Sequence, residues 1–277
     1  LDLLPASAFA EGFGLQTPML SGQLKVPRYY SYSAAALRVV RELLPQQMPM
    51  TAAMREELQT ADSVEAVYRL FGHEFWVITP CQSLCKPGRV MEGTRLTIME
   101  KEPSGFEFTI RTPGTPSRWR MFEEELEWCW SRLLPVLREI ADKGAASSAA
   151  AAHPLDDALS CRACDLAFCW FFFWVTFGPL TRGSAATGYA ILFAVLRAAG
   201  WRVRPLTAEG GGIPAGVQLD WEAILRDSAP AFVEFARASV YPLLERDSCD
   251  AGGWGARLGK AVRSVGDALK ALRGVSE

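Results

Sequence analysis

Two long apolar runs, residues 166–177 and 185–201, dominate the hydrophobic pattern of the chain, with a short polar segment between them. Both runs are too long for ordinary strands, and each is apolar on nearly all sides, which is typical of a buried helix. Pro179 favours the end of the first helix just before it, and Ser184 stands where the N-cap of the second is expected. The pattern therefore predicts a mostly helical body around a buried helical hairpin at about 155–200.

A different pattern, in which polar and apolar residues alternate, lies upstream of this hairpin. Residues 94–99 and 106–111 both alternate, and turn-forming residues at 103–105 separate them. The run 75–79 is short and β-like. We therefore expect a small antiparallel β-sheet at about 74–112, with one face buried against helices.

Apolar residues at helical spacing predict further helices on both sides of the sheet. Ser33 is expected to cap the first of them and Pro45 to end it, while the Ala/Ser-rich segment 144–152 is interpreted as a surface insertion. The predicted helices are 33–44, 51–60, 64–71, 117–141, 220–226 capped by Asp220, 229–242 and 258–272. The fold class is therefore α+β, with residues 1–32 as an extended arm or linker and residues 33–277 as a single domain.

Composition and charge narrow the class of protein. The chain has 277 residues, of which 49% are hydrophobic and 22% charged, as in a globular domain. Its formal net charge of −2 offers no electrostatic case for a nucleic-acid partner. The uncharged run 166–177 is shorter than the ~20 residues that cross a bilayer, so we expect no membrane span. The chain begins at Leu1 and not at methionine, from which we expect a piece of a longer protein.

Seven irregularly spaced cysteines favour reduced thiols and a cytoplasmic location over a secreted disulfide scaffold. Two pairs, Cys81 with Cys85 and Cys161 with Cys164, could supply four thiolates to a structural zinc. Buried thiols are favoured over that site because the second pair begins an apolar helix. Four glutamates lie near the start of the 117–141 helix, namely Glu123, Glu124, Glu125 and Glu127. The three consecutive ones, 123–125, also invite a metal site, but we interpret them as a solvated helical face. No metal and no cofactor is expected.

The segment 178–189, GPLTRGSAATGY, resembles the motif that Fic-type AMP transferases carry between two helices. The position of the catalytic histidine of that motif is Gly178, which cannot accept a proton. The position of the acidic metal ligand is Arg182, which would repel Mg²⁺. The positions of the phosphate-binding asparagine and arginines are Ser184, Ala186 and Tyr189. The resemblance thus implies a site that has lost adenylylation.

The same loop supplies the candidate ligand-binding residues, which are Thr181, Arg182, Gly183 and Ser184. A guanidinium and two hydroxyls suit phosphate, so the alternative function is a divergent Fic-like nucleotide-binding or transferase domain without its catalytic histidine. For Arg182 a structural ion pair is favoured, with an acid such as Asp156, Asp157 or Asp220.

A resemblance of wider extent rests on four segments that occur in the same order, 67–83, 92–126, 178–200 and 212–244. Together they resemble the C-terminal domain of a eukaryotic tetratricopeptide-repeat family, which includes plant negative regulators of effector-triggered immunity and the animal tetratricopeptide repeat protein thirteen. The resemblance implies a non-catalytic adaptor, a scaffold or protein-interaction domain that joins other proteins in a larger assembly, in the cytoplasm and the nucleus. No repeat is visible in these residues, so the repeats are expected upstream.

Overall fold

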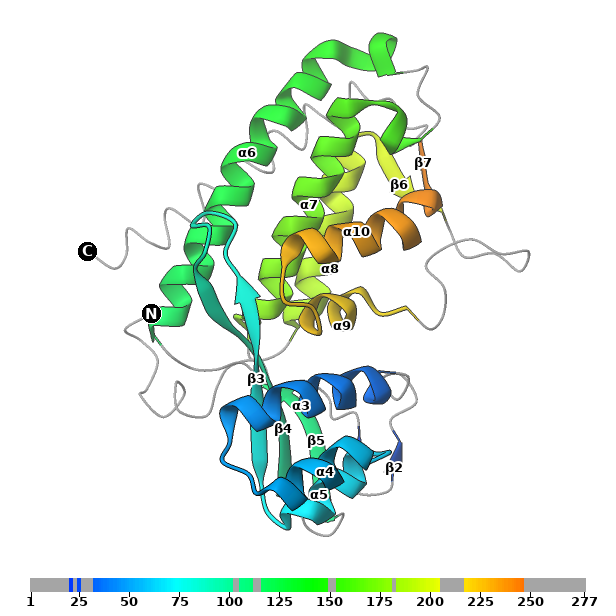
Figure 1. Cartoon of the computed structure of the whole chain (residues 1–277). Coiled ribbons are helices and arrows are strands. Elements are labelled where there is room, and N and C mark those ends of the chain that lie inside the picture. Colours follow the sequence, from blue (N-terminus) through cyan, green and yellow to red (C-terminus); the bar gives the residue numbers. More distant parts are fainter. Residues whose placement is uncertain are drawn as a thin grey trace. The chain divides into compact units, whose positions relative to one another are not determined.

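The structure is a computed structural model of the 277-residue chain. The residues that it describes are 20–21, 24–25, 32–101, 105–111, 116–148, 153–180, 183–204 and 217–246. The chain forms two compact units, each made of three separate stretches. Unit 1 contains residues 1–126, 172–188 and 216–232, and unit 2 contains residues 127–171, 189–215 and 233–277. The α+β class predicted from the sequence is confirmed (Figure 1).

Unit 1 holds a five-stranded antiparallel sheet with the strand order β2-β1-β5-β4-β3. Its strands are β1 (Leu20–Ser21), β2 (Leu24–Lys25), β3 (Phe75–Gln82), β4 (Val90–Lys101) and β5 (Gly105–Arg111). The three predicted strands are therefore confirmed, although β3 and β4 are longer than the runs from which they were predicted. The two-residue strands β1 and β2 lie in the predicted arm, where they are too short to leave a period in the sequence.

Three helices, α3 (Ser33–Gln47), α4 (Ala52–Thr60) and α5 (Val64–Phe71), accompany this sheet (Figure 1). Phe71 on α5 lies 4.8 Å from Phe75 between ring centroids, and Tyr68 stacks on Phe106 at 5.0 Å. The strand residues that share this buried face are Phe75, Val77, Leu96, Ile98, Phe106, Phe108 and Ile110. One face of the sheet is thus buried against helices, as the alternation predicts.

The starts predicted for the second and third helices, at residues 51 and 64, agree with the structure to within one residue. Thr51 accepts a hydrogen bond from the Met54 amide and Ser63 accepts one from the Ala66 amide, both as N-caps. The prediction for the first helix was wrong at both ends, because α3 begins at Ser33 with Tyr32 as its N-cap and continues past Pro45 to Gln47.

Pro45 is tolerated inside α3 because a side chain replaces the hydrogen bond that proline cannot make. Without an N–H, Pro45 leaves the carbonyl four residues earlier, that of Arg41, without its helical donor. The Gln59 side-chain amide on α4 donates to this Arg41 oxygen at 3.3 Å. The sequence pattern around Pro45 contains no sign of this distant donor.

The remaining helices are α6 (Pro116–Ser148), α7 (Ala158–Phe177), α8 (Ser184–Ala198), α9 (Leu219–Ile224) and α10 (Ala229–Ser239), with short 3₁₀ turns at Pro154–Asp156 and Tyr241–Leu243. The predicted helical hairpin is α7 and α8.

Three predictions about these helices need correction. Helix α6 continues through 144–148, since alanine favours helix; Ser184 is the first residue of α8; and Asp220 lies inside α9, whose N-cap is Gln218. Residues 149–152 and the predicted helix 258–272 lie outside the described part.

Unit 2 has its own aromatic core and a two-stranded sheet, β6 (Trp201–Val203) with β7 (Leu244–Arg246). Phe168 of α7 lies 5.6 Å from the fully buried Tyr241 between ring centroids. The Asp165 carboxylate accepts a hydrogen bond from the Tyr241 hydroxyl at 2.7 Å and forms an ion pair with Arg237. The polar groups of this core therefore neutralise one another.

Among the described helices, α7 is long and apolar enough to cross a bilayer by length and composition. Of its most apolar stretch, 56% is buried inside the protein's own fold. A core helix of a globular protein meets the same criteria, so α7 by itself is weak evidence for a membrane span.

Candidate functional site

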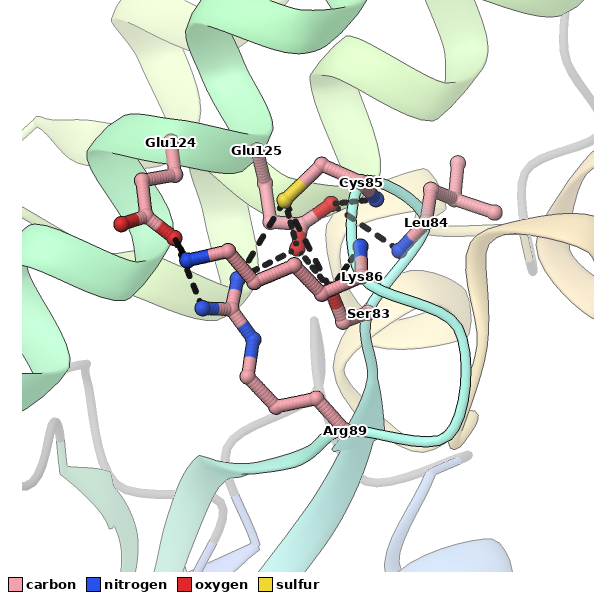
Figure 2. Close-up of polar contacts among 7 residues, drawn as sticks. All are labelled: Ser83, Leu84, Cys85, Lys86, Arg89, Glu124 and Glu125. Atoms are coloured by element: carbon pink, nitrogen blue, oxygen red, sulfur yellow. Dashed lines mark hydrogen bonds and ion pairs between the residues drawn. The ribbon is translucent and has the colours of Figure 1, made fainter.

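The loop between β3 and β4 is fastened to helix α6 by two adjacent glutamates (Figure 2). Glu125 is fully buried, and its carboxylate is the centre of the cluster. It accepts hydrogen bonds from the amides of Leu84 and Cys85, each at 3.0 Å, and from the Ser83 hydroxyl. The Cys85 thiol and the Arg89 guanidinium also donate to Oε1, each at 3.0 Å. The carboxylate therefore has five protein donors.

The loop has its own internal order, which brings these donors together. The Ser83 amide donates to the Arg89 carbonyl at 2.9 Å, and the Lys86 amide donates to the Ser83 hydroxyl at 3.0 Å. Gly88 adopts a left-handed backbone with φ of 85°, which glycine accepts without strain. Glu124 pairs with Lys86 at 2.8 Å and with Arg89 at 2.7 Å, so the second carboxylate holds the loop from its outer side.

The electrostatics of the cluster keep the carboxylate charged and the thiol neutral. Burial by itself raises the pKa of Glu125, but the hydrogen bonds from Cys85, Ser83 and Arg89 outweigh it and leave that pKa lowered. Burial, and next the bond to Glu125, raise the pKa of Cys85. A nucleophilic cysteine needs its thiolate, so Cys85 is poorly suited to attack a substrate.

The burial of Glu125 corrects the expectation that the three consecutive glutamates form a solvated face. Glu125 follows Phe122 by three residues and precedes Cys129 by four, and both of these are fully buried. Residues at this spacing lie on one side of a helix, so a carboxylate there had to be buried and bonded. The spacing was the signal in the sequence that could have identified it.

A second buried charge in unit 1, Arg118 on α6, donates its hydrogen bonds to main-chain oxygens. Its guanidinium donates to the carbonyls of Glu92, Gly93, Thr176 and Phe177 over 2.6 to 2.9 Å. The side chain is fully buried, and burial lowers the pKa of Arg118 to about 9. The group ties α6, β4 and the end of α7 together, and its donors are directed at the protein's own backbone.

Of the four predicted ligand-binding residues, Thr181 and Arg182 lie outside the described part. Gly183 has a left-handed backbone with φ of 82°, and Ser184 is buried. The Ser184 hydroxyl accepts from the Leu180 amide at 2.9 Å and lies 3.1 Å from the Leu180 carbonyl. This hydroxyl therefore closes the loop onto itself, and ligand binding by the four residues remains a prediction.

The cysteines proposed for the alternative zinc site fall into both units. Cys81 and Cys85 belong to unit 1, and Cys161 and Cys164 belong to unit 2. Burial raises the pKa of Cys81 to about 12 and also raises that of Cys164, which favours neutral thiols. Within the described ranges, no group of three or more His, Cys, Asp or Glu side chains could hold a metal ion.

Comparison with known proteins supports the wider of the two resemblances predicted from the sequence. No protein-family model and no solved structure matches the chain. Suppressor of RPS4-RLD 1 from Arabidopsis thaliana is 30% identical over 249 residues, which are 86% of this chain and 22% of that protein. Tetratricopeptide repeat protein 13 from Homo sapiens is 22% identical over 250 residues, 86% of this chain and 27% of that protein. The chain is therefore related to the tetratricopeptide-repeat proteins over most of its own length.

The relationship covers most of this chain but only about a quarter of the length of either relative. It therefore does not establish the activity of a whole protein. It extends through the β3–β4 loop, α6 and the α7–α8 hairpin, which contain the features described above. The resemblance of segment 178–189 to the Fic motif gains no support from these comparisons.

Proposed function

We propose that the chain is a non-catalytic protein-interaction domain of a larger tetratricopeptide-repeat protein. The observation that carries this proposal is the clamped loop, in which the buried Glu125 carboxylate fixes residues 83–89 from the inside. The tip of the loop is left exposed, namely Lys86, Pro87 and Gly88, and Val90 beside it is 62% exposed. A loop ordered in advance loses little conformational freedom when it binds, which favours recognition by a partner.

The chemistry of the described side chains supports the absence of catalysis. The reactive groups of the cluster and helix α6 described above, Glu125, Cys85 and Arg118, are bonded within the protein. The same holds for Asp165 and Tyr241 in unit 2. The relationship to a named tetratricopeptide repeat protein agrees with an interaction role. A cytoplasmic and nuclear location is part of this proposal, and a fluorescent fusion of the full-length protein would test it.

The test compares partner recovery by variants of the loop tip. A double variant, Lys86→Ala with Val90→Ser, changes exposed atoms and leaves the donors to Glu125 in place. The matched control is Arg55→Ala, an exposed cation on α4 of the same unit. Affinity purification with quantitative mass spectrometry should recover a set of proteins with the wild type and the control, and lose it with the tip variant.

Equal recovery by all three proteins would overturn the role of the loop.

A thermal-shift screen against nucleotides, with and without Mg²⁺, tests the alternative function, a nucleotide-binding or transferase domain. A saturable shift that disappears in Ser184→Ala would contradict a purely non-catalytic domain, because Ser184 is among the predicted ligand-binding residues.

A further inference from the structure

Trp76 is a large apolar side chain that unit 1 leaves half exposed. It lies on β3 between Phe75 and Val77, which are buried on the helix-covered face of the sheet. Successive strand residues point to opposite faces, so Trp76 points away from α3, α4 and α5. Its exposed fraction is 51%, which is high for a tryptophan in a strand. Exposed tryptophans of this kind are enriched at sites of protein recognition.

Two arginines lie beside Trp76 on the same face of the sheet. Arg95 of β4 and Arg111 of β5 are directly opposite each other in the β-ladder. The Arg95 guanidinium lies over the Trp76 ring, 5.4 Å from its centroid. Like charges that face each other across two strands are destabilising, so this arrangement costs the isolated unit free energy.

The charge of this pair is not neutralised within the described residues. Neither arginine forms an ion pair there, and the Nε atoms of Arg95 and Arg111 are buried without a hydrogen-bond acceptor. Arg111 donates to the Met99 sulfur at 2.9 Å, which is a weak acceptor. Glu74 contributes only a longer-range attraction to Arg95, whose pKa is lowered by burial and then by Arg111.

The position of Trp76 on β3 adds a geometric argument, because β3 is the edge strand of the sheet. Further along the strand the edge is protected: the Gln47 side chain bonds both main-chain groups of Ile78, at 2.7 and 2.8 Å, and Pro80 has no N–H. The Gln82 amide donates to the Asp227 carbonyl at 2.7 Å. Among the residues that the structure describes, the half that contains Trp76 has none of these devices, and an extended segment could lie alongside it.

We propose that Trp76, Arg95 and Arg111 form a binding site for an acidic segment of another protein. A carboxylate of that segment contacts the guanidiniums, and a neighbouring apolar side chain covers the Trp76 ring. Guanidinium and carboxylate form paired hydrogen bonds, and partial burial strengthens them. The inference rests on the proposed interaction role and adds the chemistry of one partner, at a surface separate from the loop tip.

The experiment measures direct binding of a probe to the 277-residue chain by fluorescence anisotropy. The probe is a fluorescein-labelled peptide of alternating glutamate and phenylalanine, and its control has glutamine at every glutamate position. We expect the acidic peptide to bind at least about tenfold more tightly than the control, and to weaken as salt rises. Arg95→Gln should weaken the acidic peptide by about tenfold, and Trp76→Thr by several-fold.

Arg55→Gln on α4 is the matched control and should bind like the wild type. Arg95→Gln should also keep or raise the melting temperature, since it removes a like-charge contact, and a purely structural role for Arg95 predicts the opposite. Equal binding of both peptides, or unchanged binding by Arg95→Gln, overturns the inference. If the wild type still recovers proteins that the loop-tip variant loses, the proposed function stands without this inference. If the wild type and the loop-tip variant recover the same proteins as well, both proposals fail.

Discussion

The Arg118 guanidinium donates to the Thr176 carbonyl over 2.6 Å and so connects the start of α6 to the last turn of α7. The final carbonyls of a helix have no partner within it, and they carry the negative end of the helix dipole. A cation at this place donates hydrogen bonds to these carbonyls and also offsets the negative end of the dipole. The ring of Phe122, 4.5 Å from the guanidinium carbon, adds a cation–π contact.

Arg118→Met should destabilise unit 1 by about 3 kcal/mol or more, because four main-chain carbonyls lose the guanidinium as a donor. Arg118→Lys should recover only part of the loss, since an ammonium has three donors and no planar fork. Urea unfolding monitored by tryptophan fluorescence measures both. The control is Arg120→Met, an exposed position on the same helix, where a change of comparable size would contradict this account.

Glu125→Gln should loosen the β3–β4 loop at neutral pH. A glutamine amide offers one acceptor oxygen and turns its NH₂ toward donors, so we expect a loss of about 2–3 kcal/mol. The local readout is hydrogen exchange at the Leu84 and Cys85 amides, which should become faster. Glu56→Gln, an exposed site on α4, should leave this exchange unchanged.

The effect of Glu125→Gln should depend on pH in a defined direction. The folded-state pKa of Glu125 is below its ordinary value of 4.5, so its carboxylate stabilises the fold above that value. The contribution is lost as the pH falls through the folded-state pKa. The difference in stability between wild type and Glu125→Gln should therefore shrink in acid, and a difference that stayed constant from pH 7 into acid would contradict the charged clamp.

The sequence was sufficient to predict the helices and strands that have a local pattern of apolar and polar residues. Apolar runs identified α7 and α8, alternation identified β4 and β5, and a short β-like run identified β3. It was insufficient where a side chain acts on a distant part of the chain. Tyr32 shows the limit: its hydroxyl donates to Glu222 at 3.1 Å and accepts from the Gln218 amide at 2.6 Å, across 190 and 186 positions.

The polar clusters were missed for a related physical reason. A buried charge such as Arg118 or Glu125 is tolerated only when many partners converge on it, and those partners come from separate elements. Glu125 shares the helical spacing of its apolar neighbours, so its burial could have been inferred. For Arg118 the partners are main-chain oxygens, which leave no mark in the amino-acid sequence.

Gly93→Ala should be strongly destabilising because the protein has no room for the added methyl group. A Cβ at this position would lie 2.5 Å from the Thr79 hydroxyl oxygen and 2.6 Å from the Thr79 carbonyl oxygen. Overpacking of this kind costs about 1–3 kcal/mol, measured as a fall in melting temperature. Adding Thr79→Ala should not rescue the variant, because the carbonyl clash persists. A full rescue would show that the hydroxyl alone is responsible.

The Pro45–Gln59 relationship predicts a coupling that a double-mutant cycle can measure. In the wild type, Gln59→Ala removes the replacement donor to Arg41, and should cost about 0.5–1 kcal/mol. In the Pro45→Ala background, residue 45 has an N–H that can bond the Arg41 carbonyl itself, so the same Gln59→Ala change should cost almost nothing. Chemical denaturation of the four proteins gives the coupling energy, with Gln46→Ala as a nearby control in place of Gln59→Ala. Additive effects would contradict the compensation, because they would mean that the contribution of Gln59 does not depend on the proline.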